Sequence, residues 1–173
     1  MGFKMSPLFK PPLGDHMTIF RRDPGELLGT FSEHSILLDN DHWPSVEHYY
    51  QAMQFEEADL QDRIRQARTP KEAVKIGDPG LPKKLLNKLW QKQRADWPRL
   101  RSIYMTRALY IKCKAYDEVA QRLLETGDLH LLETSQYDYY WGCGRDQRGE
   151  NMYGQVLMNI RERLRSENAK GSE

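Results

Sequence analysis

Cysteine is scarce in this sequence, because its 173 residues include only Cys113 and Cys143. Two thiols in a chain of this length do not make a disulfide framework, and such scarcity favours a reducing compartment. They are also too few for a cysteine-based zinc site, and no His/Cys spacing typical of zinc ligands is present. We therefore expect a cytoplasmic protein that uses neither a metal nor another cofactor.

The sequence also lacks an excess of charge of either sign and any long apolar run. It has 26 basic and 25 acidic residues, which gives a net charge of +1. A balance this even creates no general attraction to nucleic acid or to an anionic membrane, so any nucleic-acid contact needs a local basic patch. No stretch approaches membrane-spanning length and the N-terminus has no apolar signal core, so we expect no membrane association.

The length suits one domain with its own core, and neither a repeat nor a long linker divides the chain. We expect a flexible N-terminal arm over residues 1–16, the domain over 17–165 and a frayed C-terminal tail over 166–173. Helical patterns outnumber short apolar runs, which predicts a helix-dominated α+β fold with a small β-sheet. The expected strands are His16–Phe20, Ile36–Leu38 and Leu129–Leu132.

Several helices have recognisable boundaries. Thr69-Pro70-Lys71-Glu72 has the capping-box arrangement with proline at the first helical position. Asp96-Trp97-Pro98 begins a long helix that ends near Lys114, and further helices cover 117–125 and the stretch after Asn151. Apolar residues at helical spacing predict the buried face of the long helix: Leu100, Ile103, Tyr104, Ala108 and Ile111. The basic run of residues 83–94 reads as a solvated helix face or as a phosphate-binding surface.

The most informative stretch is 43–55, where Ser45 follows Pro44 as a good helix N-cap. One face of this helix is apolar, whereas Glu47, Gln51 and Gln54 form a separate polar stripe. The stripe is either a solvated helix face or part of a pocket for a small polar-ring ligand. Amides in place of Lys and Arg, and the neighbouring aromatic residues, favour the pocket.

A second cluster lies late in the chain, where the aromatic run 137–141 precedes Gly142, Gly144 and Gly149. Glycine lets the backbone adopt positive φ and approach a ligand closely. The alternative is that Trp141 belongs to the core and the glycines are ordinary loop residues. Their spacing matches neither a Walker loop nor a dinucleotide-binding fingerprint.

Separated motifs carry a resemblance to one family. The first is Trp43-Pro44-Ser45-x-Glu47-His48-Tyr49-Tyr50-Gln51, and the second is Tyr137-Asp138-Tyr139-Tyr140-Trp141-Gly142-x-Gly144 with Asn151 and Gly154. Shorter matches are Phe31-Ser32, Arg94 with Trp97, and Met105-x-Arg107-Ala108-Leu109-x-x-Lys112. Together they resemble the NADAR, or YbiA-like, family over residues 17–165. Several motifs in the right order form a more specific signal than any one of them.

The resemblance implies an N-glycosidase that cleaves a bond between ribose C1 and a nitrogen. Its known substrate classes are ribosylamino-pyrimidine phosphates of riboflavin synthesis and ADP-ribose attached to guanine, possibly on nucleic acid. The expected catalytic carboxylates are Glu47, for charge stabilisation or proton transfer, and Asp138, for positioning water or hydrogen bonding the substrate. The implied substrate-binding residues are Phe31, Ser32, Trp43, His48, Gln51, Arg94, Trp97, Tyr140, Trp141, Gly142 and Asn151. Among these, the tryptophans would stack on the base or wall the pocket, and Arg94 would hold phosphate.

The sequence departs from the family at one catalytic position, because Gln54 stands where many members carry lysine. A lysine there would serve as a nucleophile or as a charge that tunes Glu47, and glutamine does neither. The departure leaves open a subfamily that relies on Glu47, another lysine such as Lys112 in that role, or a weakened enzyme. The competing hypotheses are a module that binds ADP-ribose or a nucleotide without cleaving it, and a purely structural protein. The oligomeric state is left open.

Overall fold

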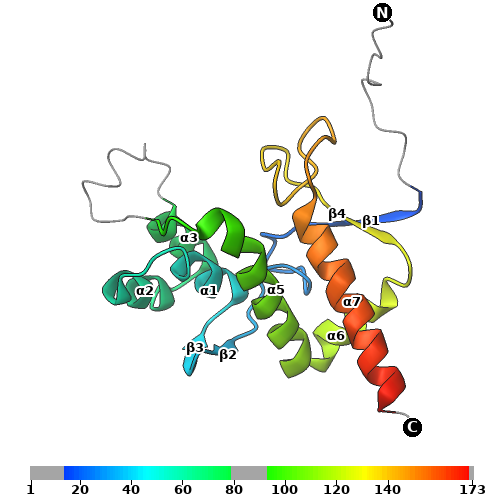
Figure 1. Cartoon of the computed structure of the whole chain (residues 1–173), viewed down its shortest axis with the longest axis horizontal. Coiled ribbons are helices and arrows are strands. Elements are labelled where there is room, and N and C mark those ends of the chain that lie inside the picture. Colours follow the sequence, from blue (N-terminus) through cyan, green and yellow to red (C-terminus); the bar gives the residue numbers. More distant parts are fainter. Residues whose placement is uncertain (1–13, 79–92, 172–173) are drawn as a thin grey trace, which may run out of the picture.

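The computed structural model describes residues 14–78 and 93–171, and within them the predicted helix-dominated α+β fold is confirmed (Figure 1). The strands are β1 His16–Ile19, β2 Ile36–Leu38, β3 Asp41–Trp43 and β4 His130–Glu133. The helices are α1 Val46–Ala52, α2 Ala58–Arg65, α3 Pro70–Gly77, α5 Trp97–Ala115, α6 Asp117–Glu125 and α7 Met152–Lys170. The N-terminal arm to residue 13 and the basic run 83–92 lie outside the described residues.

The four strands form two separate pairs. β1 pairs in parallel with β4, with His16 opposite His130, so the segments that follow these two strands leave side by side. β2 and β3 form an antiparallel hairpin whose turn residues, Asp39 and Asn40, have φ of 55° and 67°. Aspartate and asparagine tolerate this left-handed conformation. β3 was not among the expected strands, because its three residues contain no apolar run.

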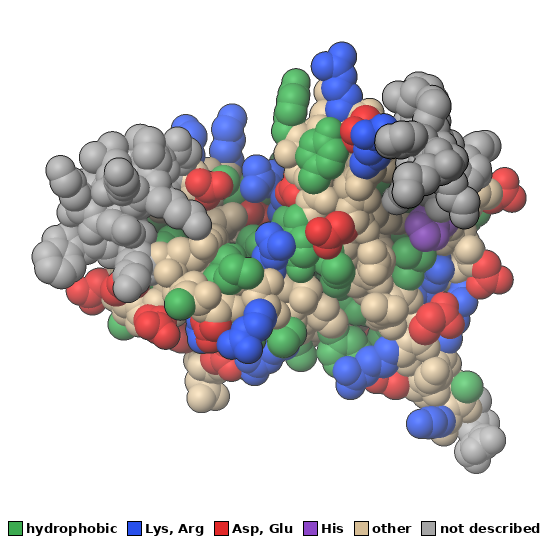
Figure 2. Space-filling view, turned by 45° about the horizontal axis from the view of Figure 1, so that its top comes forward, with side chains coloured by type: hydrophobic (Ala, Val, Ile, Leu, Met, Phe, Trp, Pro, Cys, Tyr) green, Lys and Arg blue, Asp and Glu red, His purple; other side chains and the backbone are tan. Residues whose placement is uncertain are grey.

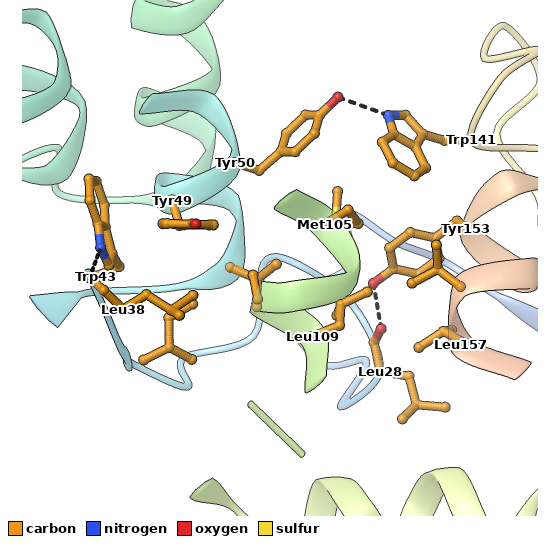
Figure 3. Packing of buried hydrophobic residues seen from close by; sticks show 14 of the residues in the cluster. Leu28, Leu38, Trp43, Tyr49, Tyr50, Met105, Leu109, Trp141, Tyr153 and Leu157 are labelled. Carbon is orange, nitrogen blue, oxygen red and sulfur yellow. Dashed lines mark hydrogen bonds between the residues drawn. The ribbon is translucent and has the colours of Figure 1, made fainter. Parts of the chain in front are cut away.

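α5 runs through the middle of the molecule, with α1, α2 and α3 to one side and α7 with the β1–β4 pair to the other (Figure 1). Buried side chains from both sides meet at α5, where Met105 and Leu109 lie among residues of the other elements (Figure 3). Burial of this apolar surface is the main stabilising contribution. The core therefore joins the N-terminal and C-terminal halves of the chain.

The predicted buried face of the long helix was partly wrong. Ala108 is buried, but Ile103 is 58% exposed, and Met105, Leu109 and Cys113 occupy the core instead. The physical reason is that α5 is packed by α1, α6, α7 and β2, so its burial does not follow a single stripe. In α7, the apolar residues that recur at helical spacing all lie in the core: Tyr153, Val156, Leu157, Ile160 and Leu164 are buried.

The predicted helix boundaries are confirmed where a side chain caps them. Thr69 Oγ1 accepts a hydrogen bond from the backbone N–H of Glu72 at 3.1 Å, and Ser45 Oγ accepts one from that of His48 at 3.4 Å. Such caps satisfy the free donors of a first helical turn. At the other end of the chain, α7 continues to Lys170, so residues 166–170 are helical where we expected fraying.

Candidate active site

Glu47 is the centre of the polar stripe, and its side chain is fully buried. Thr30 Oγ1 donates a hydrogen bond to Glu47 Oε2 at 2.6 Å, and Gln51 Nε2 donates one to Oε1 at 2.7 Å. The backbone N–H of Glu47 also donates to the carbonyl oxygen of Thr30 at 3.1 Å. Each carboxylate oxygen therefore has its own donor, and the side chain is held in one orientation.

The stripe is a chain of amides that ends on this carboxylate. Gln93 Nε2 donates to Gln54 Oε1 at 2.8 Å, and Gln54 Nε2 donates to Gln51 Oε1 at 2.6 Å. Gln51 then donates to Glu47, so every bond in the chain points the same way. Gln54 thus contacts Glu47 only through Gln51. The solvated-face hypothesis does not describe the stripe, since Glu47, Gln51 and Gln54 are all buried.

A guanidinium group connects Glu47 to the second predicted carboxylate. Arg21 Nη1 lies 3.5 Å from Glu47 Oε2, and Arg21 Nη2 donates to Asp138 Oδ2 at 3.2 Å. Burial lowers the pKa of Arg21, but Glu47, Asp138 and Glu133 outweigh it and raise the pKa above its ordinary value. Asp138 is 29% exposed, and its other oxygen accepts from the backbone N–H groups of Tyr140 and Trp141.

Aromatic side chains extend from this cluster toward α5. Trp141 Nε1 donates to the hydroxyl of Tyr50 at 3.1 Å (Figure 3), and the ring of Tyr50 lies 5.1 Å from that of Trp97. Tyr140 packs against Trp141 at 4.8 Å, and the guanidinium of Arg101 stacks on Tyr140 with 3.1 Å between its carbon and the ring centroid. These rings supply the apolar wall that a planar base requires.

Two surface cavities adjoin the carboxylate cluster. One, of about 570 Å³, is lined by Arg21, Arg22 and residues 135–140, and therefore by Asp138 and Tyr140. The other, of about 300 Å³, is lined by Phe20, Glu133 and Ser135 among others, and it shares Arg21 with the first. Both cavities place solvent-accessible space next to Arg21, and the first also reaches Asp138.

Arg94 lies near the aromatic wall but already has a carboxylate partner. Its Nε and Nη2 donate to the two oxygens of Asp96 at 2.6 and 3.1 Å, and its Nη1 donates to the hydroxyl of Tyr104. Asp96 is the largest cause of the raised pKa of Arg94. A phosphate group would have to share this guanidinium with Asp96, so the predicted phosphate role of Arg94 stays a prediction.

Other predicted binding residues are not brought to the carboxylates. Trp43 is buried in the core, where Nε1 donates to the carbonyl of Leu38 (Figure 3). His48 lies on the other side of α1, where its ring nitrogens contact Ser45 Oγ at 2.8 Å and the carbonyl of Ala67 at 3.1 Å. Both make the contacts of core residues, and their roles toward a ligand stay predictions.

Phe31 and Ser32 directly follow Thr30 in the sequence, and their side chains differ in burial. The Ser32 hydroxyl is buried and accepts a hydrogen bond from the Lys112 ammonium, which also donates to the carbonyls of Leu27 and Gly29. Burial lowers the pKa of Lys112 to about 8. Phe31 is half-buried. Lys112 therefore fixes the loop that presents Thr30 to Glu47, and it does not contact the carboxylates itself.

Gly142 and Asn151 shape the loop that carries Asp138. A Cβ on Gly142 would lie 2.4 Å from Glu133 Oε2, so only glycine fits against that buried carboxylate. Asn151, at φ 50°, donates to the carbonyl of Leu131 and accepts from the backbone N–H of Glu133. These residues connect the loop to β4, and their roles toward a ligand stay predictions.

Sequence reasoning missed Arg21, Thr30 and Tyr50 as members of the cluster. Arg21 directly follows the first expected strand, and it reaches Asp138 only because β1 lies beside β4. Thr30 adjoins the Phe31-Ser32 motif, which was the available signal for it.

Among the described residues there is no group of three side chains arranged to hold a metal ion, and no helix there is long and apolar enough to cross a membrane.

This arrangement defines the class of protein: an α+β domain whose buried carboxylate, guanidinium and aromatic wall share one site. The NADAR domain model matches residues 20–165, and the chain belongs to this family. An N-glycosidase from Nostoc punctiforme is 34% identical over 146 residues, which span 83% of this chain and 88% of that protein. The YbiA N-glycosidase of Escherichia coli K12 is 32% identical over 135 residues, 78% of each chain.

Two further comparisons extend this result. The NMR structure of E. coli YbiA superposes with a TM-score of 0.75 at 26% identity, covering 95% of this chain and 96% of that one. The chloroplastic riboflavin biosynthesis protein PYRR of Zea mays is 34% identical over 148 residues. That match spans 78% of this chain but only 22% of the maize protein. The predicted family and fold are therefore confirmed.

Proposed function

We propose that this chain is an N-glycosidase that hydrolyses the bond between ribose C1 and a nitrogen of its substrate. The observation that carries the proposal is the buried carboxylate of Glu47, held by Thr30 and Gln51 beside Arg21 and the Tyr50–Trp141 pair. The relatives named N-glycosidases support the same chemistry. Glu47 and Asp138 are the two proposed catalytic carboxylates.

The reaction needs what these residues supply. When the C1–N bond breaks, its electron pair leaves with the nitrogen and positive charge develops on the ribose. An adjacent carboxylate stabilises that charge or accepts a proton from the attacking water, whose oxygen bonds to C1. The leaving nitrogen takes up one proton in exchange. Asp138 is more exposed than Glu47 and accepts hydrogen bonds from two backbone N–H groups, which supports a proposed role in orienting water or a ribose hydroxyl.

The proposed substrate is a ribosylamino-pyrimidine phosphate of riboflavin synthesis. The riboflavin name of the maize relative favours it over ADP-ribosyl-guanine, which shares the same ribose subsite. Figure 2 also shows Lys and Arg side chains interspersed with Asp and Glu over the face in view, so the described residues of that face form no extended basic patch for nucleic acid. A small nucleotide fits this charge distribution better, and a cytoplasmic location stays a prediction.

A non-catalytic nucleotide-binding module is the second candidate, and Gln54 is the observation that favours it. Its neutral amide donates to Gln51 and supplies neither a nucleophile nor a charge next to Glu47. A binding module would hold the intact ligand, whereas an enzyme would release the base. The Gln54→Lys variant separates the enzyme from the binding module. A module that is inactive only because it lacks this lysine should release base once the lysine is restored.

The deciding experiment incubates the protein separately with the ribosylamino-pyrimidine phosphate and with ADP-ribosyl-guanosine. Base release is followed by chromatography and mass spectrometry, with Glu47→Gln as the test variant and the exposed Glu56→Gln as its matched control. Release that is lost in Glu47→Gln but kept in Glu56→Gln supports the glycosidase and identifies the substrate. Tight binding of both compounds without any release contradicts it.

A further inference from the structure

Arg21 lies between two carboxylates that come from distant parts of the chain. Its Nη1 is 3.5 Å from Glu47 Oε2 on α1, and its Nη2 donates to Asp138 Oδ2 in the loop after β4. Arg21 is 2% exposed and Glu47 is 0% exposed, so water screens their interaction very little. Arg21 is therefore the direct electrostatic link between the two predicted catalytic groups.

The surroundings make this cation necessary. Glu133 of β4, which is also buried, brings a third carboxylate to Arg21. The other titratable groups that face the cluster come from several elements: Tyr50 of α1, Tyr153 of α7 and Arg101 of α5. His48, on the other side of α1, interacts with Glu47 only through its charge. Without Arg21, the negative charges would repel one another in a poorly solvated place, and a proton would neutralise one of them.

The contacts of Arg21 are not those of a residue kept for stability alone. Its Nε and Nη1 have no hydrogen-bond acceptor among the described residues, although both atoms are buried. Buried donors without acceptors are unfavourable, and an apolar side chain of similar volume often serves the fold equally well. Its guanidinium carbon lies 5.9 Å from the ring centroids of both Trp141 and Tyr153, so the pocket wall also fixes its place.

We infer that Arg21 is a positioning residue that keeps Glu47 ionised and fixes its geometry relative to Asp138. The inference rests on the proposed function, and it assigns Glu47 one of the two roles open to it. As an anion throughout the reaction, Glu47 stabilises the positive charge that develops on the ribose, and it does not transfer a proton. The proton for the leaving nitrogen then comes from another group or from solvent.

The first test compares the rate–pH profiles of Arg21→Met and Arg21→Lys with that of the wild type. Arg21→Met should reduce kcat by about 10²-fold and move the acid limb upward by roughly 1 to 3 pH units, because the ionised carboxylate loses its cation. Arg21→Lys keeps the charge, so its acid limb should stay close to that of the wild type while kcat falls. The exposed Arg63→Met serves as the matched control and should behave as the wild type.

A second measurement does not depend on turnover. In protein labelled with ¹³C at the glutamate carboxyl groups, the Glu47 signal is assigned by its loss in Glu47→Gln and followed between pH 4 and 8 by NMR. It should remain that of the ionised form to lower pH in the wild type and in Arg21→Lys than in Arg21→Met. If Arg21→Met does not fold, Arg21→Gln, which removes the charge and keeps polar atoms, replaces it in both assays.

The outcomes separate the two hypotheses. A wild type that releases no base from either compound overturns the proposed function, while the NMR titration still tests Arg21. Rate profiles and Glu47 titrations that are the same in Arg21→Met and in the wild type overturn the inference. So does an Arg21→Lys variant whose acid limb is displaced as far as that of Arg21→Met.

Discussion

Gln51 Nε2 donates a hydrogen bond to Glu47 Oε1 at 2.7 Å, one helical turn away on α1. Because Gln51 Oε1 accepts from Gln54, the Gln51 amide has only one orientation that satisfies both neighbours. The pair therefore does more than satisfy two buried polar groups. It aims a donor at the carboxylate from the side opposite to Thr30 and Arg21, which bind the other oxygen.

Gln51→Met is the direct test of this relationship, since methionine keeps the length of the side chain and removes its polar atoms. Glu47 Oε1 then loses its donor inside the protein, which should lower the free energy of unfolding by about 1–3 kcal/mol. We expect kcat for base release to fall by about 10- to 10²-fold as the carboxylate loses its orientation. Urea unfolding and the base-release assay measure the two effects.

The exposed Gln121→Met on α6 is the matched control for this substitution, and it should change neither quantity. A Gln51→Met variant with wild-type kcat would show that the amide chain contributes to folding only.

Gly77 provides a second way to disturb the same amide without touching α1. A Cβ at this position would lie 2.6 Å from Gln51 Oε1 and 3.1 Å from Gln51 Cβ. In Gly77→Ala the flexible Gln51 side chain must turn away, so base release should fall by about tenfold, a smaller effect than removal of a catalytic group. Because alanine favours helices over glycine by up to about 1 kcal/mol, the loss of stability should be small.

Gly171→Ala is the control for Gly77→Ala, because the nearest atom to its added methyl group is Glu167 O at an ordinary 3.6 Å. Thermal unfolding and base release of both variants distinguish a local effect on Gln51 from a general loss of folding. A Gly77→Ala variant that is badly destabilised would contradict this explanation.

Local sequence signals predicted the elements of this fold well, whereas the site depended on long-range pairing. The cap at Ser45 and the apolar stripe from Tyr153 to Leu164 are properties of single helices, so the sequence displays them directly. Arg21 meets Asp138 only after β1 has paired with β4, and it meets Glu47 through Thr30, whose backbone bonds to both residues. Trp43 is the opposite case, because its nearness to Glu47 in the motif suggested a shared pocket, and the hairpin turns its indole into the core.

The contacts of Lys112 likewise depend on long-range packing that the sequence does not display. Its place in the apolar pattern of α5 gave no sign that it would be 1% exposed and bonded to the loop of residues 27–32. In Lys112→Met the carbonyls of Leu27 and Gly29 lose their donor, so the free energy of unfolding should fall by about 2–3 kcal/mol. Base release should also fall, because the same loop presents Thr30 to Glu47.

The exposed Lys114→Met, two residues further along α5, is the control for Lys112→Met. Urea unfolding of both variants measures the stability, and the activity assay reports on the loop. Equal stabilities of Lys112→Met and the wild type would mean that these buried hydrogen bonds contribute nothing net.

The burial of His48 leads to a prediction of how the stability of the protein depends on pH. Burial lowers its pKa from the ordinary 6.5, although the carbonyl of Ala67 and the charge of Glu47 act to raise it. Above pH 6.5 the imidazole is neutral in both the folded and the unfolded chain, so it contributes no pH dependence. As the pH falls below 6.5, the unfolded chain binds a proton that folded His48 still excludes, and stability is lost.

The contribution of His48 is measured by urea unfolding at pH 7.5, 6.5, 5.5 and 5.0. One excluded proton accounts for a slope of at most about 1.4 kcal/mol per pH unit below pH 6.5. His48→Gln should lower stability at pH 7.5, because the contacts with Ser45 and Ala67 are disturbed, yet its curve should be flatter than that of the wild type at acid pH. His42→Gln, at an exposed position on β3, should keep the wild-type slope. Parallel curves for His48→Gln and the wild type would show that other buried groups cause the acid sensitivity.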